Sequence, residues 1–490
     1  MSKISKQMAS SFISKSRGVI NYLNPRIQFL ASSLSHHRDH HMPRRHAKIA
    51  QTFSGGNIRS DISGVRQYFV PAKAKQLETL QIDDTTYHNK VLNYPGGEVK
   101  FISKLNILPE SQEERIHCYR ILDDDGVPTT NHFEKVSEEF AIKIYRKMVA
   151  LRTMDSIFSE AQKEGKISFY LTTEGEEAIN VASAAALQMD DPVFPQYREA
   201  GVLLWRGFTL RDFANQCFGN SNDWNKGRQM PIHYGSNKFN YFTVSSTIAA
   251  QVPHAVGAAY SLKMDGSNAC AVTYFGEGGT STGDFHGAIN FAAVLETPLI
   301  LFCRNNGWAI STPVAEQFRC DGVAVKGEGY GVVSIRVDGN DALAIYNAVR
   351  VARQIATTQQ RPVLIEALTY RSGNHTTLDD STRYRSDEES KWWKVTQDPV
   401  TRFRKWLEYE NWWNPIVEEE LVANLKIQVL EAIEDAEKIE KPSIDDIFTD
   451  VYDTSPTNLQ EQEALLKQTI KKDPHEYPSN FKNFNTTTKN

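Results

Sequence analysis

The 490-residue sequence has little cysteine, and what it has is scattered. Its five cysteines are an odd number and lie far apart, at Cys118, Cys217, Cys270, Cys303 and Cys320. Such a set forms neither a disulfide framework nor a metal site, so we expect reduced residues in the core.

Long hydrophobic runs and a strong charge of one sign are also missing. The longest apolar segments have the length of strands, well below the roughly 18 residues of a membrane-spanning helix. The net charge is -5, which gives no reason to expect nucleic acid as a partner. We therefore predict no membrane span and no nucleic-acid partner. With 40% hydrophobic residues, the chain is able to bury a large core.

Acidic residues are almost absent from the first 50 positions, where Asp39 is the single acid among nine Lys or Arg and many Ser. This composition is typical of a mitochondrial transit peptide and predicts a protein of the mitochondrial matrix. The sequence does not fix where the peptide ends, and an ordinary basic tail is the alternative. Residues 51–100 are predicted to be disordered or extended, and residues 483–490 to be a disordered tail.

The rest of the chain alternates between apolar strands and amphipathic helices, which predicts an α/β fold with a mostly parallel sheet covered by helices on both faces. We assign residues 101–400 to this domain, with an arm at its start, and residues 401–482 to a helical C-terminal region. Strands are predicted at 191–194, 271–275, 298–303, 332–337 and 362–370. Helices are predicted at 137–163, 175–187, 198–206, 249–263, 283–295, 342–355, 401–409 and 417–439, and an extended stretch at 445–456.

The segment from Val272 to Thr312 is the most informative. Glu277 follows one buried strand and Asn306 the next, and parallel strands bring their carboxyl ends to one edge of the sheet. A carboxylate, an amide oxygen and the N–H groups around Gly278 and Gly279 predict a site for Mg²⁺ bridging to phosphate. Arg304 adds a positive charge that is able to form a bidentate interaction with phosphate. The alternative, a tight turn and an unrelated loop, is weakened because both features occur together.

Other polar turns are weaker candidates. Tyr197 and Arg198 begin a helix, where they either hold a diphosphate or lie on the surface. The hydroxyl-rich turn 243–248 either binds a monovalent cation or caps a helix. The long loop 217–241, which contains His233, is predicted to be a lid or a partner surface. His375 is the best acid/base candidate because it lies in a polar loop and imidazole changes charge near pH 7.

Gly276-Glu277-Gly278, separated by residues 279–304 from Asn305-Asn306, resembles the diphosphate-binding motif of thiamine diphosphate enzymes, with Glu277 in place of the usual Asp. Over residues 101–482 the chain also resembles the α subunits of mitochondrial branched-chain 2-oxo acid dehydrogenases. The matching motifs are PQYREAGVLLWRGF, AAQVPHAVGAAY, FGEGGTSTGDFHGAINFAA, FCRNNGWAISTP, GYGVVSIRVDGND and LIEALTYRSGNHTT.

The resemblance implies the thiamine diphosphate-binding fold and a role in branched-chain amino acid catabolism. The implied reaction decarboxylates branched-chain 2-oxo acids oxidatively and acylates the lipoyl group of a core acyltransferase. The implied cofactors are thiamine diphosphate and Mg²⁺, with K⁺ as a further candidate. The implied partners are a β subunit in a heterotetramer of two α and two β chains, the acyltransferase, and a regulatory kinase and phosphatase. An α subunit of a pyruvate or acetoin dehydrogenase is the alternative.

The resemblance also implies residue roles. Mg²⁺ would be held by Glu277, Asn306 and the carbonyl of Trp308, and a glutamate of the β subunit would activate the cofactor. A K⁺ site would use Ser245, Thr247 and Gln251, but Ala250 replaces an expected threonine. Thr376 replaces the first phosphorylated serine, and Ser386 matches the second. The residues expected around the cofactor are Tyr197, Arg198, Ser246, Ile248, Gly276, Glu277, Gly278, Gly279, Arg304, Asn306 and His375, the last also being catalytic. A non-catalytic scaffold is disfavoured because Glu277, Asn306 and His375 are intact.

Overall fold

The computed structural model describes residues 91–94, 97–100, 115–473 and 476, and it divides into two compact units, Met1–Leu105 and Asn106–Asn490. In the first unit the described residues form an antiparallel hairpin of β1 (Val91–Tyr94) and β2 (Gly97–Lys100). The predicted transit peptide (1–50) and the tail (483–490) lie outside the described residues.

The second unit is built on a sheet of five parallel strands in the order β3-β4-β5-β9-β8. Their bounds are β3 (Val193–Phe194), β4 (Ala271–Gly276), β5 (Leu299–Asn305), β8 (Val333–Asp338) and β9 (Val363–Leu368). The register pairs Gly276 with Arg304 and Asn305 with Leu368, so β4, β5 and β9 end side by side. The predicted α/β fold with a parallel sheet is confirmed, and the residues that follow β4 and β5 leave from one edge.

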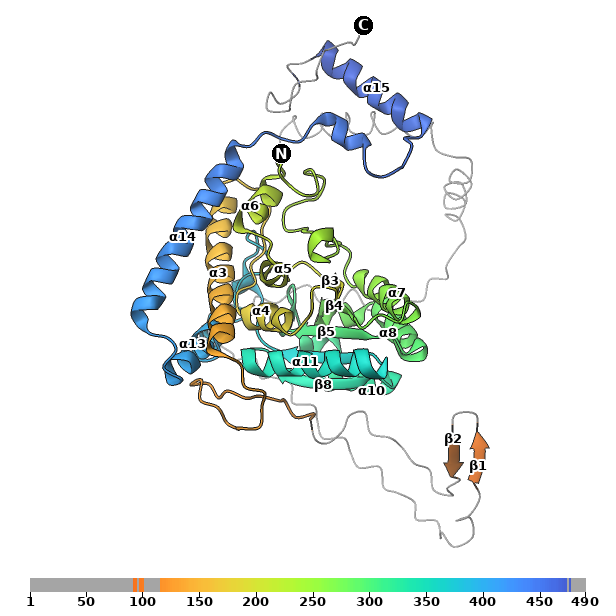
Figure 1. Ribbon diagram of the computed structural model, residues 1–490, viewed down its shortest axis with the longest axis vertical. Coiled ribbons are helices and arrows are strands. Elements are labelled where there is room, and N and C mark those ends of the chain that lie inside the picture. The colour runs from red at the N-terminus through yellow and green to blue at the C-terminus, as the bar shows by residue number, and fades with distance from the viewer. Residues whose placement is uncertain (1–90, 95–96, 101–114, 474–475, 477–490) are drawn as a thin grey trace, which may run out of the picture. The chain divides into compact units, whose positions relative to one another are not determined.

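The central strands β4, β5 and β9 are mainly apolar and buried because helices cover both faces of the sheet (Figure 1). Val272, Tyr274 and Phe302 point to a core that also contains α3 (Glu138–Lys163), α4 (Glu177–Ala185), α5 (Ala200–Arg206) and α11 (Ala342–Gln359). The alternate residues, such as Phe275 and Leu301, point to a second core beneath α7 (Gln251–Met264) and α8 (Gly283–Leu295).

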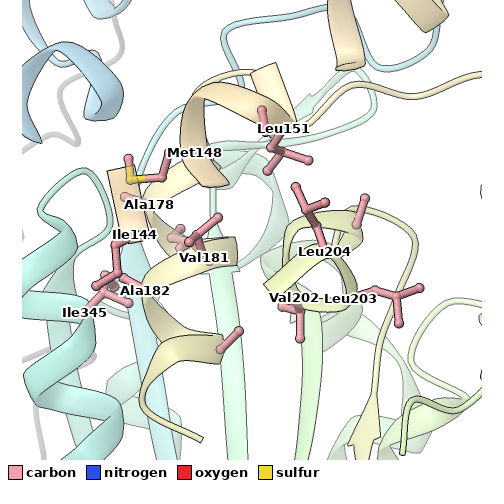
Figure 2. Close-up of a cluster of buried hydrophobic side chains, with 14 of the residues drawn as sticks. Ile144, Met148, Leu151, Ala178, Val181, Ala182, Val202, Leu203, Leu204 and Ile345 are labelled. Atoms are coloured by element: carbon pink, nitrogen blue, oxygen red, sulfur yellow. The ribbon is translucent and has the colours of Figure 1, made fainter. Parts of the chain in front are cut away.

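Helix α3 shows how the sequence positions the first core. Ser137 caps it by accepting a hydrogen bond from the backbone N–H of Phe140 at 3.3 Å. Ile144, Met148 and Leu151 follow at steps of four and three residues and are fully buried. Figure 2 shows these side chains in one cluster with the small residues of α4 and with α5 and Ile345 of α11.

The remaining elements of the second unit are mostly short. They are α6 (Leu210–Phe218), η2 (Asn237–Phe239), η3 (Glu277–Ser281), β6 (Trp308–Ala309), β7 (Thr312–Pro313), α9 (Val314–Gln317), α10 (Ala324–Tyr330) and η4 (Ser381–Arg383). Of these, η3 directly follows β4, and β6 pairs with β7 just after β5.

The C-terminal region is helical, as predicted. It contains α13 (Pro399–Tyr409), α14 (Pro415–Lys438), η5 (Ile444–Phe448) and α15 (Thr457–Lys472), and α12 (Asp387–Thr396) precedes the predicted start at residue 401. The expectation of an extended stretch at 445–456 is wrong at its start, because Ser443 accepts a hydrogen bond from Asp445 N–H and initiates η5. Helix α14 packs against α3 and α6, whereas no residue of α15 is buried.

All five cysteines are free, but Cys118 is exposed, so the expectation of a core position fails there. Among the residues that the structure describes, no helix is both long and apolar enough to cross a membrane.

Candidate active site

A cavity of about 450 Å³ lies at the edge of the sheet where β4 and β5 end. Every residue that the resemblance placed around the cofactor lines it. Beyond that set, the cavity is lined by Phe169, Leu171, Gln196, Met230, Ile232, His233, Trp308, Ala309, Ile310 and Arg371. The structure therefore brings together segments that are far apart in the sequence.

Glu277 is the first residue of η3, and its side chain is buried beneath the cavity, with 1% of its surface exposed. Its Oε2 accepts a hydrogen bond from Asn306 N–H at 3.3 Å, but its Oε1 has no partner. Burial raises the pKa of this carboxyl to about 7. A buried carboxylate oxygen without a donor is costly, so this position fits a cation.

The other predicted metal ligands are already held in place. Asn306 donates from Nδ2 to Glu176 at 2.6 Å and accepts from Trp308 N–H at 3.2 Å on Oδ1. The Trp308 carbonyl accepts from Arg371 at 3.2 Å. Each oxygen retains a second lone pair. No group of three or more His, Cys, Asp or Glu suited to a metal occurs within the described ranges, so an ion here needs mixed oxygen ligands, as Mg²⁺ accepts.

Arg304 is buried and donates to two carboxylates and an amide. Its Nη1 lies 2.8 Å from Glu176, its Nη2 3.3 Å from Gln196, and its Nε donates to Glu199. Two of its five N–H groups remain for a ligand. Sequence reasoning missed Glu176 and Glu199, because nothing in their spacing signals that they share one arginine.

Gly278 permits η3 to approach β6. A Cβ added to Gly278 would lie 2.6 Å from the Cβ of Ala309, closer than real Cβ atoms come. This glycine is therefore needed for contact between backbones, in addition to any N–H group that it offers to an anion.

His375 lies between two arginines. Its Nδ1 is 3.3 Å from Nη2 of Arg198 and 3.5 Å from Nη1 of Arg371, and its carbonyl accepts from Arg198 at 2.7 Å. Burial and these two charges lower the pKa of the imidazole to about 3. The sequence-based reason for choosing His375, a change of charge near pH 7, is therefore wrong. The ring is neutral, and because Nδ1 faces donors we assign the proton to Nε2.

Arg198 holds the segment around His375 and the segment before α4 together. It is buried, with 3% exposed, and also donates from Nη1 to the carbonyl of Thr172. Tyr197 is half-buried, and its ring centroid lies 6.2 Å from that of His375 at nearly a right angle.

The candidate K⁺ residues lie in the turn before α7 and at the first position of that helix. Gln251 donates from Nε2 to the carbonyl of Tyr274 at 2.8 Å, while its Oε1 is buried without a partner. The hydroxyl of Ser245 accepts from Thr247 N–H at 3.3 Å. Ala250 contributes no side-chain oxygen, so this set fits a cation less completely than Glu277 and Asn306 do.

His233 is a residue of the cavity wall that sequence reasoning did not assign. Its Nε2 lies 2.6 Å from the hydroxyl of Ser246, and 5% of the residue is exposed. The only signal was its place in the unusually long loop 217–241.

The two candidate regulatory residues lie outside the cavity. Thr376 is half-buried, accepts from Leu378 N–H at 3.2 Å, and lines a separate cavity of about 580 Å³. Ser386 is exposed and caps α12 by accepting from Glu389 N–H at 3.1 Å.

Comparison with known proteins agrees with this geometry. Residues 145–445 match the model of the family described as dehydrogenase E1 component. The chain is 59% identical over 409 residues to an Arabidopsis thaliana protein named 2-oxoisovalerate dehydrogenase subunit alpha 2, mitochondrial, covering 83% of this chain and 87% of the relative. A Dictyostelium discoideum protein named 2-oxoisovalerate dehydrogenase subunit alpha, mitochondrial, is 50% identical over 383 residues, covering 78% of this chain and 86% of the relative. A Homo sapiens protein of the same name is 46% identical over 386 residues, covering 79% of this chain and 87% of the relative. The chain therefore belongs to the dehydrogenase E1 component family and, within it, to the 2-oxoisovalerate dehydrogenase α subunits.

Proposed function

We propose that this chain is the α subunit of the decarboxylating component of a mitochondrial branched-chain 2-oxo acid dehydrogenase complex. Its activity is that of 3-methyl-2-oxobutanoate dehydrogenase, as the names of the relatives from Arabidopsis thaliana, Dictyostelium discoideum and Homo sapiens indicate. The observation that carries the proposal is the single cavity that gathers the diphosphate motif, His375 and the two arginines.

The family depends on thiamine diphosphate, and the residues present fit it. When bound, this cofactor supplies the nucleophilic carbon and the electron sink for loss of CO₂. Glu277, Asn306 and the Trp308 carbonyl would hold Mg²⁺, since the unpaired Oε1 of Glu277 calls for a cation. The N–H groups of Gly278 and Gly279 and the remaining donors around the cavity would bind the diphosphate. A K⁺ ion at Gln251 is a weaker part of the proposal.

Protein side chains then have orienting and electrostatic roles. The Nε2–H group of neutral His375 would donate a hydrogen bond to the substrate carboxylate or to the cofactor, and Arg198 and Arg371 keep the ring neutral and in place. Arg371 also donates to the Trp308 and Ile310 carbonyls, which ties this loop to β6.

The cavity also favours branched-chain acids over the pyruvate alternative. Apolar side chains form one part of its wall, where a branched alkyl group would be buried: Phe169, Leu171, Met230, Ile232 and Ile310. Each buried methyl or methylene group contributes on the order of 1 kcal/mol.

Membership of this component implies a β subunit. The finer assembly that we propose is a heterotetramer of two α and two β chains that delivers acyl groups to a lipoyl-bearing core acyltransferase. Control by a kinase and phosphatase at Thr376 and Ser386 is part of the same proposal.

The test is to co-express the chain with its β subunit and measure kcat/KM for 3-methyl-2-oxobutanoate and for pyruvate, with and without added thiamine diphosphate and Mg²⁺. We expect a preference of about tenfold or more for the branched acid and no turnover without the cofactor. A preference for pyruvate would favour the alternative.

A further inference from the structure

The environment of His233 fixes which ring nitrogen carries hydrogen. Nδ1 lies 3.1 Å from the carbonyl oxygen of Pro231, which only accepts hydrogen bonds, so Nδ1 carries the hydrogen. In the neutral imidazole Nε2 is then an acceptor, and the hydroxyl of Ser246, 2.6 Å away, donates to it. The lone pairs of Ser246 are left to face the cavity, which both residues line.

A strained turn positions the imidazole ring of His233 at the cavity. Ile232, the preceding residue, has φ +67°, a left-handed conformation that is strained for a β-branched residue. The buried side chain of Gln216 on α6 clamps the turn from both sides: its Nε2 donates to the Met230 carbonyl at 2.8 Å, and its Oε1 accepts from Ile232 N–H at 2.9 Å. Strain of this kind persists only where the surroundings enforce it.

The segment that carries Ser246 is fixed against the same loop. Val244 N–H donates to the Tyr234 carbonyl at 3.0 Å, and a Cβ on Gly235 would lie 2.2 Å from Oγ1 of Thr243. The two segments thus run in direct contact just before Ser246. His233 and Ser246 meet because their backbones are held, while Ser246 itself is exposed to the cavity.

We propose that His233 is a positioning residue for cofactor binding: it fixes the Ser246 hydroxyl as a hydrogen-bond acceptor toward a donor group of the ligand. The inference rests on the proposed function, because it takes thiamine diphosphate as that ligand. His233 acts through Ser246, so its contribution exists only while the Ser246 hydroxyl is present.

The test is a double-mutant cycle on the co-expressed α and β chains, with the dissociation constant of thiamine diphosphate measured calorimetrically in the presence of Mg²⁺. His233→Asn keeps a donor near Nδ1 but does not reach Ser246, whereas His233→Gln places an acceptor near the position of Nε2. We expect His233→Asn to weaken binding about fivefold or more, and His233→Gln to stay within about threefold of the unsubstituted protein.

The decisive comparison is between Ser246→Ala and the double variant that also carries His233→Asn. Their dissociation constants for thiamine diphosphate should differ by less than about twofold. An equal loss in both backgrounds, or no loss in either, would overturn the inference, since a merely structural histidine gives additive effects. Melting temperatures of all variants show that they fold. Failure of the unsubstituted tetramer to bind thiamine diphosphate would overturn the proposed function itself, which is a different result from additivity.

Discussion

At the residue scale, the buried charged groups at the cavity differ in how their hydrogen bonds are satisfied. Arg304 is matched by Glu176 and Glu199, and each of these carboxylates receives a donor. Glu277 is equally buried, yet one of its oxygens has none. Glu176 and Glu199 therefore have a structural role at the site, whereas Glu277 has a free oxygen with which to bind a metal ion.

We predict that Glu277→Gln weakens Mg²⁺-dependent binding of thiamine diphosphate by about tenfold or more, because a neutral amide contributes no charge to the metal. In the absence of metal at pH 8, Glu277→Gln should have a higher melting temperature than the unsubstituted protein, because the variant no longer buries a carboxylate. Glu328→Gln, an exposed change on α10, is the matched control. Calorimetry and thermal melts measure both effects, and unchanged metal dependence would contradict the assignment.

Asp155 provides a prediction about pH. It accepts hydrogen bonds from Tyr170 at 2.8 Å and from Thr173 N–H and Oγ1 at 2.6 Å, yet complete burial raises its pKa to about 7. The folded protein therefore binds this proton more tightly than the unfolded chain, whose Asp titrates near pH 4. The stability that Asp155 contributes is complete below about pH 4 and is lost as pH rises to about 7.

The measurement compares free energies of unfolding for the unsubstituted protein and Asp155→Asn at pH 5 and pH 8. At pH 5 the free energy of unfolding of the variant should be lower by about 1–3 kcal/mol. At pH 8 this difference in free energy between the two proteins should be smaller. A gap that does not depend on pH would refute the titration.

Glu277, Asn306 and Arg304 could be placed at the cavity from the sequence because they lie at strand ends, and strand ends are readable from apolar runs. Other cavity residues, such as Ser246 and Ile248, came only from the family resemblance.

Sequence reasoning missed Glu176, Glu199 and His233, whose roles depend on contacts between distant segments. It also misjudged the charge of His375, because burial and, after it, the charges of Arg198 and Arg371 lower the pKa of the imidazole, and neither effect is visible in the sequence.

At the scale of elements, the loop from Arg371 to Ser386 is held by arginines rather than by an apolar core. Arg385 donates to the carbonyls of Arg371 and, at 2.7 Å, of Gly373, while Arg198 holds the carbonyl of His375. A new anion within this loop would compete for these guanidinium groups.

We therefore predict that Thr376→Glu lowers kcat/KM by about tenfold or more, in the direction expected for a phosphate of roughly -2 charge. Thr376→Gln, of similar size but neutral, should retain most activity. Limited proteolysis should cut the loop faster in the Glu variant. Full activity of Thr376→Glu would show that this loop does not control the cavity.

The sequence predicted the central strands and the long helices α3, α11 and α14, but not the shorter helices α6, α10 and α12. The strands and α8 of the central unit have the expected bounds within about two residues. The helix α15 was not assigned separately, although Leu459, Leu466 and Ile470 lie on one of its faces and are half-buried.

At the scale of the whole molecule, the cavity is chemically incomplete. Glu277 is the only carboxylate among the described residues that line it, and we assign that group to the metal. The surface of α7 and α8 also exposes Tyr260, Met264, Phe291 and Val294, which is typical of a partner interface. Both observations favour an active site that is shared with the β subunit.

We predict that the purified chain alone does not decarboxylate 3-methyl-2-oxobutanoate and that adding the β subunit restores turnover. The assay should titrate the β subunit into a fixed amount of this chain, with activity reaching a plateau at equal amounts. Turnover by the isolated chain, with the β subunit shown to be absent by mass spectrometry, would contradict the shared site.

The contact between Gly278 and Ala309 also restricts how this family can change. A methyl group at position 278 has no room while position 309 carries one, since the two Cβ atoms would lie 2.6 Å apart. Which residue fits at position 278 therefore depends on which residue occupies position 309. Among related sequences, alanine at the first position should occur together with glycine at the second, so that the two sites vary as a pair across lineages.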